Sequence, residues 1–159
     1  MANSEVMIRR ADASDSAAIA DLINKSFAID SSYIEELSET QISIASELEE
    51  GVYFVAIDSQ DQLIGCVYVH STSRGIFKLA VEASRRRRGY GSTLMKEAES
   101  YCKAMGWSTV RIAILSFRTD LANYYRGLGY TETGEVRDIK PPAHAIQPCH
   151  MILMSKELF

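Results

Sequence analysis

The sequence is poor in cysteine, in proline and in long apolar runs. Its three cysteines, Cys66, Cys102 and Cys149, show no C-x-x-C pair and no spacing typical of zinc ligands, so we expect reduced thiols, no disulfide framework and no metal site. The three prolines all lie within residues 138–148, and we expect this whole segment to be a loop. No run approaches the roughly 18 apolar residues of a membrane span, and the N-terminal segment MANSEVMIRR lacks the apolar core of a signal peptide. We therefore expect a cytoplasmic protein with no membrane partner.

The chain also lacks an excess of positive charge. Its formal net charge is −4 and its isoelectric point is near 5.4, so the protein as a whole repels nucleic acid. No repeat or low-complexity tract divides the 159 residues, and this length suits one domain. We therefore expect a single domain over residues 1–159 that does not bind nucleic acid, and we leave a homodimer open.

Two kinds of apolar pattern alternate along the chain. Short runs of β-branched and aromatic residues predict strands, and apolar residues three and four positions apart predict helices. The predicted order is β-α-α-β-β-β-α-β-α-β-β, an α/β (α+β) fold with helices packed on a mixed sheet. The predicted strands are residues 6–11, 52–57, 63–71, 75–82, 108–115, 149–158 and a run that starts at Tyr130. The predicted helical regions are residues 12–27, 31–50 with a break near Ser38, 89–105 and 121–128.

Residues 83–95, ASRRRRGYGSTLM, place four arginines and two glycines between a predicted strand and a predicted helix. A helix N-terminus leaves backbone N–H groups unpaired and carries partial positive charge, and glycines let a phosphate approach closely. Two known phosphate loops do not match, since G-x-G-x-x-G would need glycine at Leu94 and the P-loop needs G-K-[ST]. The alternative for the arginines is a solvated charge run or a nucleic-acid patch, but Gly89 and Gly91 favour phosphate binding.

The pattern Arg86-x-x-Gly89-x-Gly91 resembles the acyl-CoA pyrophosphate loop of the GCN5-related N-acetyltransferase family. FKLAVE is similar to the central strand of that family, and DLANYYRGLGYTETGE is similar to its later helix-and-strand block. The resemblance covers nearly the whole chain and implies a mostly antiparallel sheet of about seven strands flanked by about four helices. It also implies an enzyme that uses acetyl-CoA, without metal, to acetylate a primary amine by direct transfer in a ternary complex.

The resemblance assigns roles to individual residues of this sequence. The strand backbone at Leu79, Ala80 and Val81 is expected to hold the pantetheine arm of coenzyme A and to polarise the thioester carbonyl. The loop and the first helical turn are expected to hold the pyrophosphate through backbone amides, with a further hydroxyl from Thr93. The residues of this second group are Arg86, Arg87, Arg88, Gly89, Tyr90, Gly91, Ser92 and Thr93.

Tyr125 is the candidate general acid, because it aligns with an aromatic acid of the family. A phenol of pKa about 10 can protonate a thiolate of pKa about 8.5 when the two are in contact. The helix pattern alone would place Tyr125 in an apolar stripe with Leu121, Tyr124 and Leu128. The alignment favours catalysis for Tyr125 and packing for Tyr124. Arg118 stands where the family often has asparagine, so its cofactor contact stays open.

The base that takes the amine proton stays open. Glu35, Glu36 and Glu39 belong to the region that shapes the acceptor pocket in the family, although a solvated helix face is the stronger explanation for each of them. The other candidates are Glu82, His70, His144 and His150. Cys149 and His150 are neighbours on a predicted strand and point to opposite faces, so they do not form a nucleophile and base pair.

The acceptor is expected to be a small-molecule amine, such as a polyamine, an amino acid or an amino sugar. Acetylation of a protein N-terminus or of a lysine is the alternative within the same chemistry. A non-catalytic acyl-CoA-binding or regulatory module is the alternative from another class, in which the loop is kept and the acceptor chemistry is not.

Overall fold

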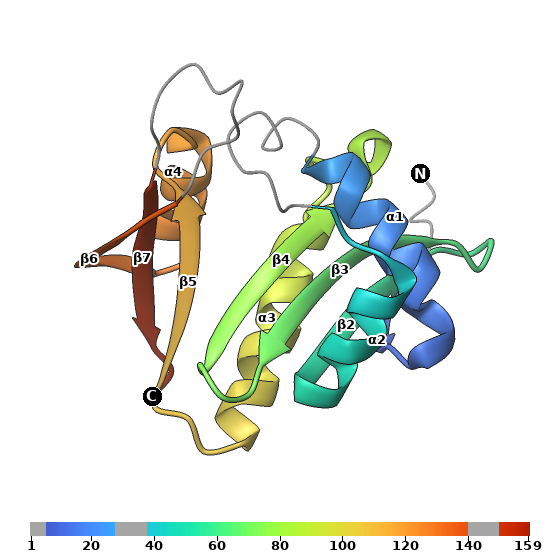
Figure 1. The fold of residues 1–159 in the computed structure, drawn as a ribbon, viewed down its shortest axis with the longest axis horizontal. Helices are drawn as coiled ribbons and strands as arrows, with labels where there is room; N and C mark the ends of the chain where they lie inside the picture. The colour runs from blue at the N-terminus through green and yellow to red at the C-terminus, as the bar shows by residue number, and fades with distance from the viewer. Residues whose placement is uncertain (1–5, 28–37, 140–149) are drawn as a thin grey trace.

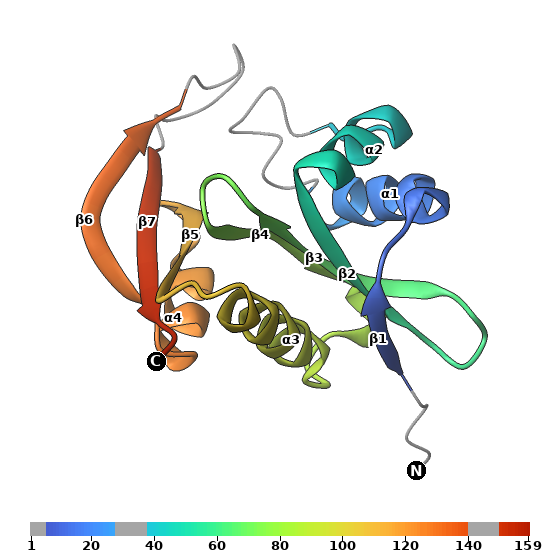
Figure 2. The same ribbon diagram turned by 90° about the horizontal axis from the view of Figure 1, so that it is seen from below.

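A computed structural model describes residues 6–27, 38–139 and 150–159. The described residues form one sheet of seven strands in the order β1-β2-β3-β4-β5-β7-β6, of which Figure 1 labels β2 to β7 and Figure 2 labels β1. The elements are β1 (Met7–Arg10), α1 (Ser16–Ser26), α2 (Gln41–Glu50), β2 (Gly51–Ile57), β3 (Leu63–His70), β4 (Gly75–Val81), α3 (Tyr90–Ala104), β5 (Thr109–Leu115), α4 (Thr119–Gly127), β6 (Thr131–Asp138) and β7 (His150–Glu157). The predicted order and fold class are confirmed. No helix within these ranges is long and apolar enough to span a membrane.

Reciprocal side-chain caps stand in the short turn before α1 and at the start of α2. Asp12 accepts from the Ser14 N–H and forms a reciprocal capping box with Asp15 in the short turn before α1. Thr40 and Ser43 form a second such box at the start of α2. Such boxes satisfy backbone N–H groups that a helix start leaves unpaired. The predicted helical region 31–50 is therefore helical only from residue 41 within its described part, and residues 31–37 lie outside the described residues.

The helices cover both faces of the sheet, with α1 and α2 on one face and α3 and α4 on the other (Figure 2). Each face has its own apolar core. The core under α3 and α4 contains Leu94, Met95, Ala98, Ala122 and Tyr125, among others. The core under α1 and α2 contains Ile19, Ile23, Ile44, Val55 and Ala80, among others.

β4 and β5 separate along most of their length. They are the one parallel pair of the described sheet, and their pairing is confined to Gly75 and Arg111. β4 also carries a bulge against β3, because Phe77 faces Tyr68 and Ala80 faces Cys66, so that two residues of β4 stand opposite one of β3. A bulge bends its strand and increases the local twist. The bulge therefore lies where β4 turns away from β5.

Candidate functional site

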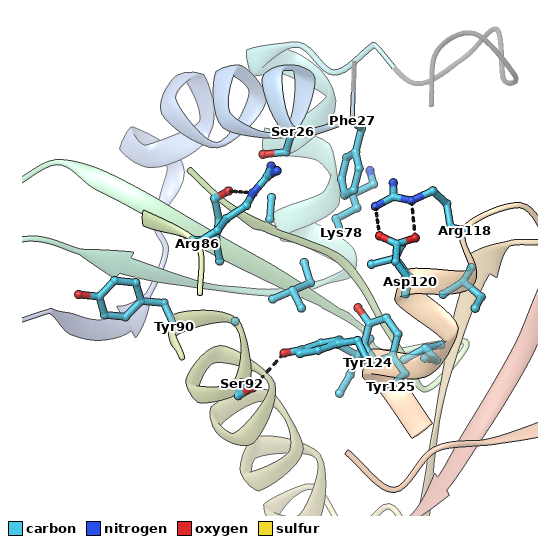
Figure 3. Close-up of a pocket in the computed structure, with 18 of the residues that line it drawn as sticks. Ser26, Phe27, Lys78, Arg86, Tyr90, Ser92, Arg118, Asp120, Tyr124 and Tyr125 are labelled. Carbon is cyan, nitrogen blue, oxygen red and sulfur yellow. Dashed lines mark hydrogen bonds and ion pairs between the residues drawn. The ribbon is translucent and has the colours of Figure 1, made fainter. Parts of the chain in front are cut away.

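A cleft of about 1080 Å³ opens where β4 and β5 separate. This volume is slightly larger than that of most small-molecule sites, which span about 300–1,000 Å³. Its walls come from both strands, from the loop before α3, from the start of α4 and from the end of α1 (Figure 3). The predicted general acid and all the predicted cofactor-binding residues line this cleft except Arg88 and Thr93.

The start of α3 faces the cleft with its backbone. Gly89 is the residue before the helix, with a left-handed φ of 85° and no side-chain cap. A Cβ on Gly91 would lie 3.3 Å from the Tyr124 hydroxyl and 3.8 Å from Leu79 and Val81 side chains, so glycine keeps this side of the first turn open. The Thr93 hydroxyl donates back to the Gly89 carbonyl at 2.9 Å. The uncapped helix start carries the partial positive charge that attracts a phosphate.

The four arginines have different partners. Arg85 donates to the buried carboxylate of Asp58 in the β2–β3 turn at 2.8 Å. The Arg86 Nε donates to the Val81 carbonyl at 3.1 Å. Arg87 lines the cleft with a left-handed φ of 64°, whereas the exposed Arg88 lies off its wall. Arg85 therefore anchors the loop, and the run is not one uniform basic patch.

Asp58 is well prepared to hold Arg85. Its Oδ1 accepts backbone N–H groups from Gln60 and Gln62, both at 2.9 Å. These backbone hydrogen bonds, Gln62 first, and the Arg85 guanidinium lower the pKa of Asp58, while burial opposes them. The carboxylate is therefore charged at neutral pH and fixes the loop to the β2–β3 turn.

One edge of β4 faces the cleft at Leu79, Ala80 and Val81. On the opposite edge, Ala80 and Val81 pair with Cys66 and Gly65 of β3. Within the described chain, β4 meets β5 only at its first residue, so the ladder does not continue across the cleft. Backbone groups on this edge can therefore pair with an extended ligand, as a strand does at a sheet edge.

Tyr125 and Tyr124 place their hydroxyl groups differently. Tyr125 is 8% exposed, its ring packs edge-on against Tyr124 and Tyr130, and its hydroxyl points into the cleft (Figure 3). Burial raises the pKa of Tyr125, so its phenol stays protonated at neutral pH. The Tyr124 hydroxyl lies 3.1 Å from the Ser92 Oγ. Tyr124, which the pattern assigns to packing, therefore also reaches the loop end of the cleft.

Three charged side chains, Lys78, Arg118 and Asp120, line the end of the cleft away from the loop, and of these the sequence singled out Arg118 alone. Asp120 is the one carboxylate among the described residues that line the cleft. Arg118 donates to both of its oxygens, at 3.1 and 3.0 Å, and this hydrogen bond lowers the pKa of Asp120. Lys78 of β4 lines the same end together with Phe27 (Figure 3). Acidic residues are common in the first turn of a helix because they interact favourably with the helix dipole. The sequence therefore gives no sign that Asp120 lines a binding site.

The candidate bases of the sequence lie elsewhere. Glu39 contacts Lys78 without lining the cleft, and Glu82 is exposed beside Arg85. His70 contacts Ser73 and Glu50 at the opposite end of β3, and His150 begins β7. Glu35, Glu36 and His144 lie outside the described residues.

Comparison with known proteins identifies a family. The model of the acetyltransferase (GNAT) family matches residues 17–130, while a comparison with curated proteins finds no match. An N-acetyltransferase from Staphylococcus aureus Mu50 has the same fold, with 18% identity and a TM-score of 0.79 over 98% of this chain and 100% of that chain.

Two further solved structures share the fold and differ in acceptor. A phosphinothricin acetyltransferase from Sinorhizobium meliloti, in complex with acetyl-CoA, is 19% identical, with a TM-score of 0.79 over 96% of this chain and 88% of that chain. The ribosomal-protein-S18-alanine N-acetyltransferase from Escherichia coli is 15% identical, with a TM-score of 0.77 over 97% of this chain and 94% of that chain. At these identities, the likeness establishes the fold.

Proposed function

This chain belongs to the acetyltransferase (GNAT) family, and on that premise we propose that it transfers an acetyl group from acetyl-CoA to the primary amine of a small molecule, directly and within a ternary complex. The observation that carries the proposal is the cleft between β4 and β5, which joins an open strand edge to an uncapped helix N-terminus. The family assignment favours an enzyme over a non-catalytic acyl-CoA-binding module.

The two ends of coenzyme A suit two different parts of the cleft. Its diphosphate fits the start of α3, where Gly89 and Gly91 leave the backbone accessible and Arg86 and Arg87 add positive charge. Its pantetheine arm has amide groups that can pair with the edge of β4 at residues 79–81 that β5 leaves unpaired, as an added strand would. The thioester then lies near Val81 and Tyr125, which line the same cleft.

The transfer breaks one bond and forms one. The neutral amine attacks the thioester carbonyl carbon, and the oxyanion that forms accepts a hydrogen bond from a backbone N–H of β4 near Val81. The C–S bond then breaks, and Tyr125 protonates the departing thiolate. The proton that the amine loses passes to water, from which Tyr125 recovers its own. Tyr125 is in the acid form that this step requires, and because burial raises its pKa, it gives up its proton only to a thiolate in direct contact.

The acceptor amine reaches the thioester from the end of the cleft lined by Asp120. The Asp120 carboxylate attracts an ammonium ion from solvent, while the lowered pKa of Asp120 makes it a weak base. Asp120 is therefore proposed to bind the acceptor rather than to deprotonate it. The structural likeness to an enzyme named for phosphinothricin supports a small acceptor, and the likeness to one named for an alanine of a ribosomal protein supports a protein acceptor.

Two measurements test the proposal in sequence. Titration calorimetry with acetyl-CoA should show binding, and an absence of binding at millimolar ligand would refute acetyl-CoA as the donor. Release of free thiol is then followed over a panel of amino acids, polyamines, amino sugars and short peptides with free N-termini. Turnover with a small amine supports the proposal, turnover with peptides alone moves the acceptor to a protein, and Tyr125→Phe serves as the control for background hydrolysis.

A further inference from the structure

Lys78 occupies an unusual position at the bulge of β4. Its φ is 57°, in the left-handed region that residues with a side chain rarely adopt. Its ammonium lies between two carboxylates, 2.6 Å from Glu39 and 2.6 Å from Glu47. All three side chains are largely buried, with 27%, 12% and 22% of their surfaces exposed. A strained backbone is retained only where its surroundings hold it, and this ion cluster is the contact that holds the Lys78 side chain.

Both glutamates are themselves held by other elements, Glu39 through its backbone and Glu47 through its carboxylate and its backbone carbonyl. The Asn24 side chain of α1 donates to the Glu39 carbonyl and accepts from the Glu39 N–H, at 2.9 and 2.8 Å. The Tyr53 hydroxyl of β2 donates to Glu47 at 2.9 Å, and the Tyr68 hydroxyl of β3 donates to the Glu47 carbonyl at 2.8 Å. The ammonium of Lys78 therefore meets a rigid acidic pair rather than two mobile surface side chains.

The bulge is what brings Lys78 to these acids. Ile76, Leu79 and Val81 all pack in the core under α3. Leu79 and Val81 follow Ile76 by an odd number of residues, three and five, so a regular strand would place them on the opposite face. Side chains alternate between faces in a regular strand, and one extra residue exchanges the faces beyond it. Without the bulge, Lys78 would lie on the face of Ile76, away from Glu39 and Glu47. The ion cluster and the bulge therefore depend on each other.

We propose that Lys78 is a positioning residue for acetyl transfer: its ammonium, held by Glu39 and Glu47, fixes the bulge and so sets the backbone of residues 79–81 against which the thioester lies. This inference rests on the proposed function. The diphosphate end at α3 does not depend on Lys78. Loss of the Lys78 side chain therefore disturbs the site of the thioester and leaves the site of the diphosphate unchanged.

The test compares two variants of Lys78 with one matched control. Lys78→Met removes the charge, and Lys78→Gly removes the charge while allowing the left-handed φ without strain. Lys156→Met is the control, because the Lys156–Glu99 pair joins β7 to α3 at 2.8 Å with side-chain exposures of 27% and 15%, close to those of Lys78 and Glu39, and neither residue lines the cleft. If Lys78→Met does not fold, Lys78→Gly and Glu47→Gln carry the test.

Steady-state kinetics and amide NMR provide the readouts. Both Lys78 variants should lower kcat by about 10- to 100-fold, the size expected for a misplaced reacting group, with little change in acetyl-CoA affinity. Lys78→Arg should recover part of kcat. On addition of acetyl-CoA, amide shifts at residues 89–92 should persist in the Lys78 variants, whereas those at residues 79–81 should shrink. Lys156→Met should lower the melting temperature and keep kcat.

The outcomes distinguish a failure of the positioning role of Lys78 from a failure of the proposed acetyl-CoA binding. A Lys78→Gly variant with the kcat of the wild type would overturn the positioning role, as would an equal loss of kcat in Lys156→Met. Unchanged shifts at residues 79–81 in both Lys78 variants would overturn it without touching the proposed function. Wild-type protein without shifts at residues 89–92 would refute acetyl-CoA binding itself, and the inference with it.

Discussion

Gly89 and Gly106 stand at the two ends of α3 and have nearly the same left-handed φ. Their φ angles are 85° and 84°, and a Cβ built on either would meet no atom within 4 Å. Alanine at either position therefore adds no clash and only the cost of a left-handed backbone, about 1–2 kcal/mol. For a domain of this size, that cost lowers the melting temperature by about 2–8 °C. The two variants should be destabilised equally in thermal melts.

Only one of these glycines lies at the proposed diphosphate site. Alanine at Gly89 pulls the backbone toward a negative φ and turns the amides that face the cleft. The loss of one hydrogen bond to a charged group, about 1.5–3 kcal/mol, weakens acetyl-CoA binding by about 10- to 100-fold. Calorimetry should find this loss in Gly89→Ala and wild-type affinity in Gly106→Ala. Equal affinities in the two variants would refute the role of the α3 N-terminus.

Three further predictions concern Tyr125, Asp58 and Arg85. Tyr125→Phe should lower kcat by about 10²- to 10⁴-fold with unchanged acetyl-CoA affinity. Tyr124→Phe should weaken acetyl-CoA binding, because it removes the hydroxyl that contacts Ser92. A Tyr125→Phe variant with the kcat of the wild type would refute the assignment of Tyr125 as general acid. Because the pKa of Asp58 is lowered in the folded protein, the unfolded chain takes up its proton first as the pH falls below about 4. Stability measured in urea should therefore fall on acidification, less steeply in Asp58→Asn. Arg85→Gln should reduce the melting temperature and keep acetyl-CoA affinity. Arg87→Gln should weaken acetyl-CoA binding and keep the melting temperature. If both variants changed the same quantity, the separate roles of the two arginines would be contradicted.

Local signals made much of the fold predictable. The apolar stripe of α3 and the glycines at its two ends place this helix to within about one residue, since caps and periodicity are properties of neighbouring residues. The same local reasoning found the loop at residues 86–92 and the helix start behind it. The order of strands and helices along the chain followed in the same way from short β-branched runs and apolar stripes.

Contacts between distant segments were not predictable in this way. Asp58 and Arg85 lie 27 positions apart, and nothing beside either residue announces the pair. Lysine has no preference for a left-handed backbone, so the bulge at Lys78 leaves no mark in the run GIFKLAVE. The reach of Tyr124 to Ser92 depends on how α3 and α4 lie against each other. The roles of Glu35, Glu36 and His144 stay predictions.

The separation of β4 from β5 links substrate concentration to folding. In a closed sheet, a backbone ladder would join the two strands along their whole length, whereas here it is confined to Gly75 and Arg111. An acyl-CoA whose arm pairs with β4 supplies part of the missing ladder, so the substrate acts as an additional strand. A ligand that binds only the folded state at 100 times its Kd stabilises it by about 2.7 kcal/mol. The resistance of the protein to unfolding should therefore vary with the acetyl-CoA supply around it.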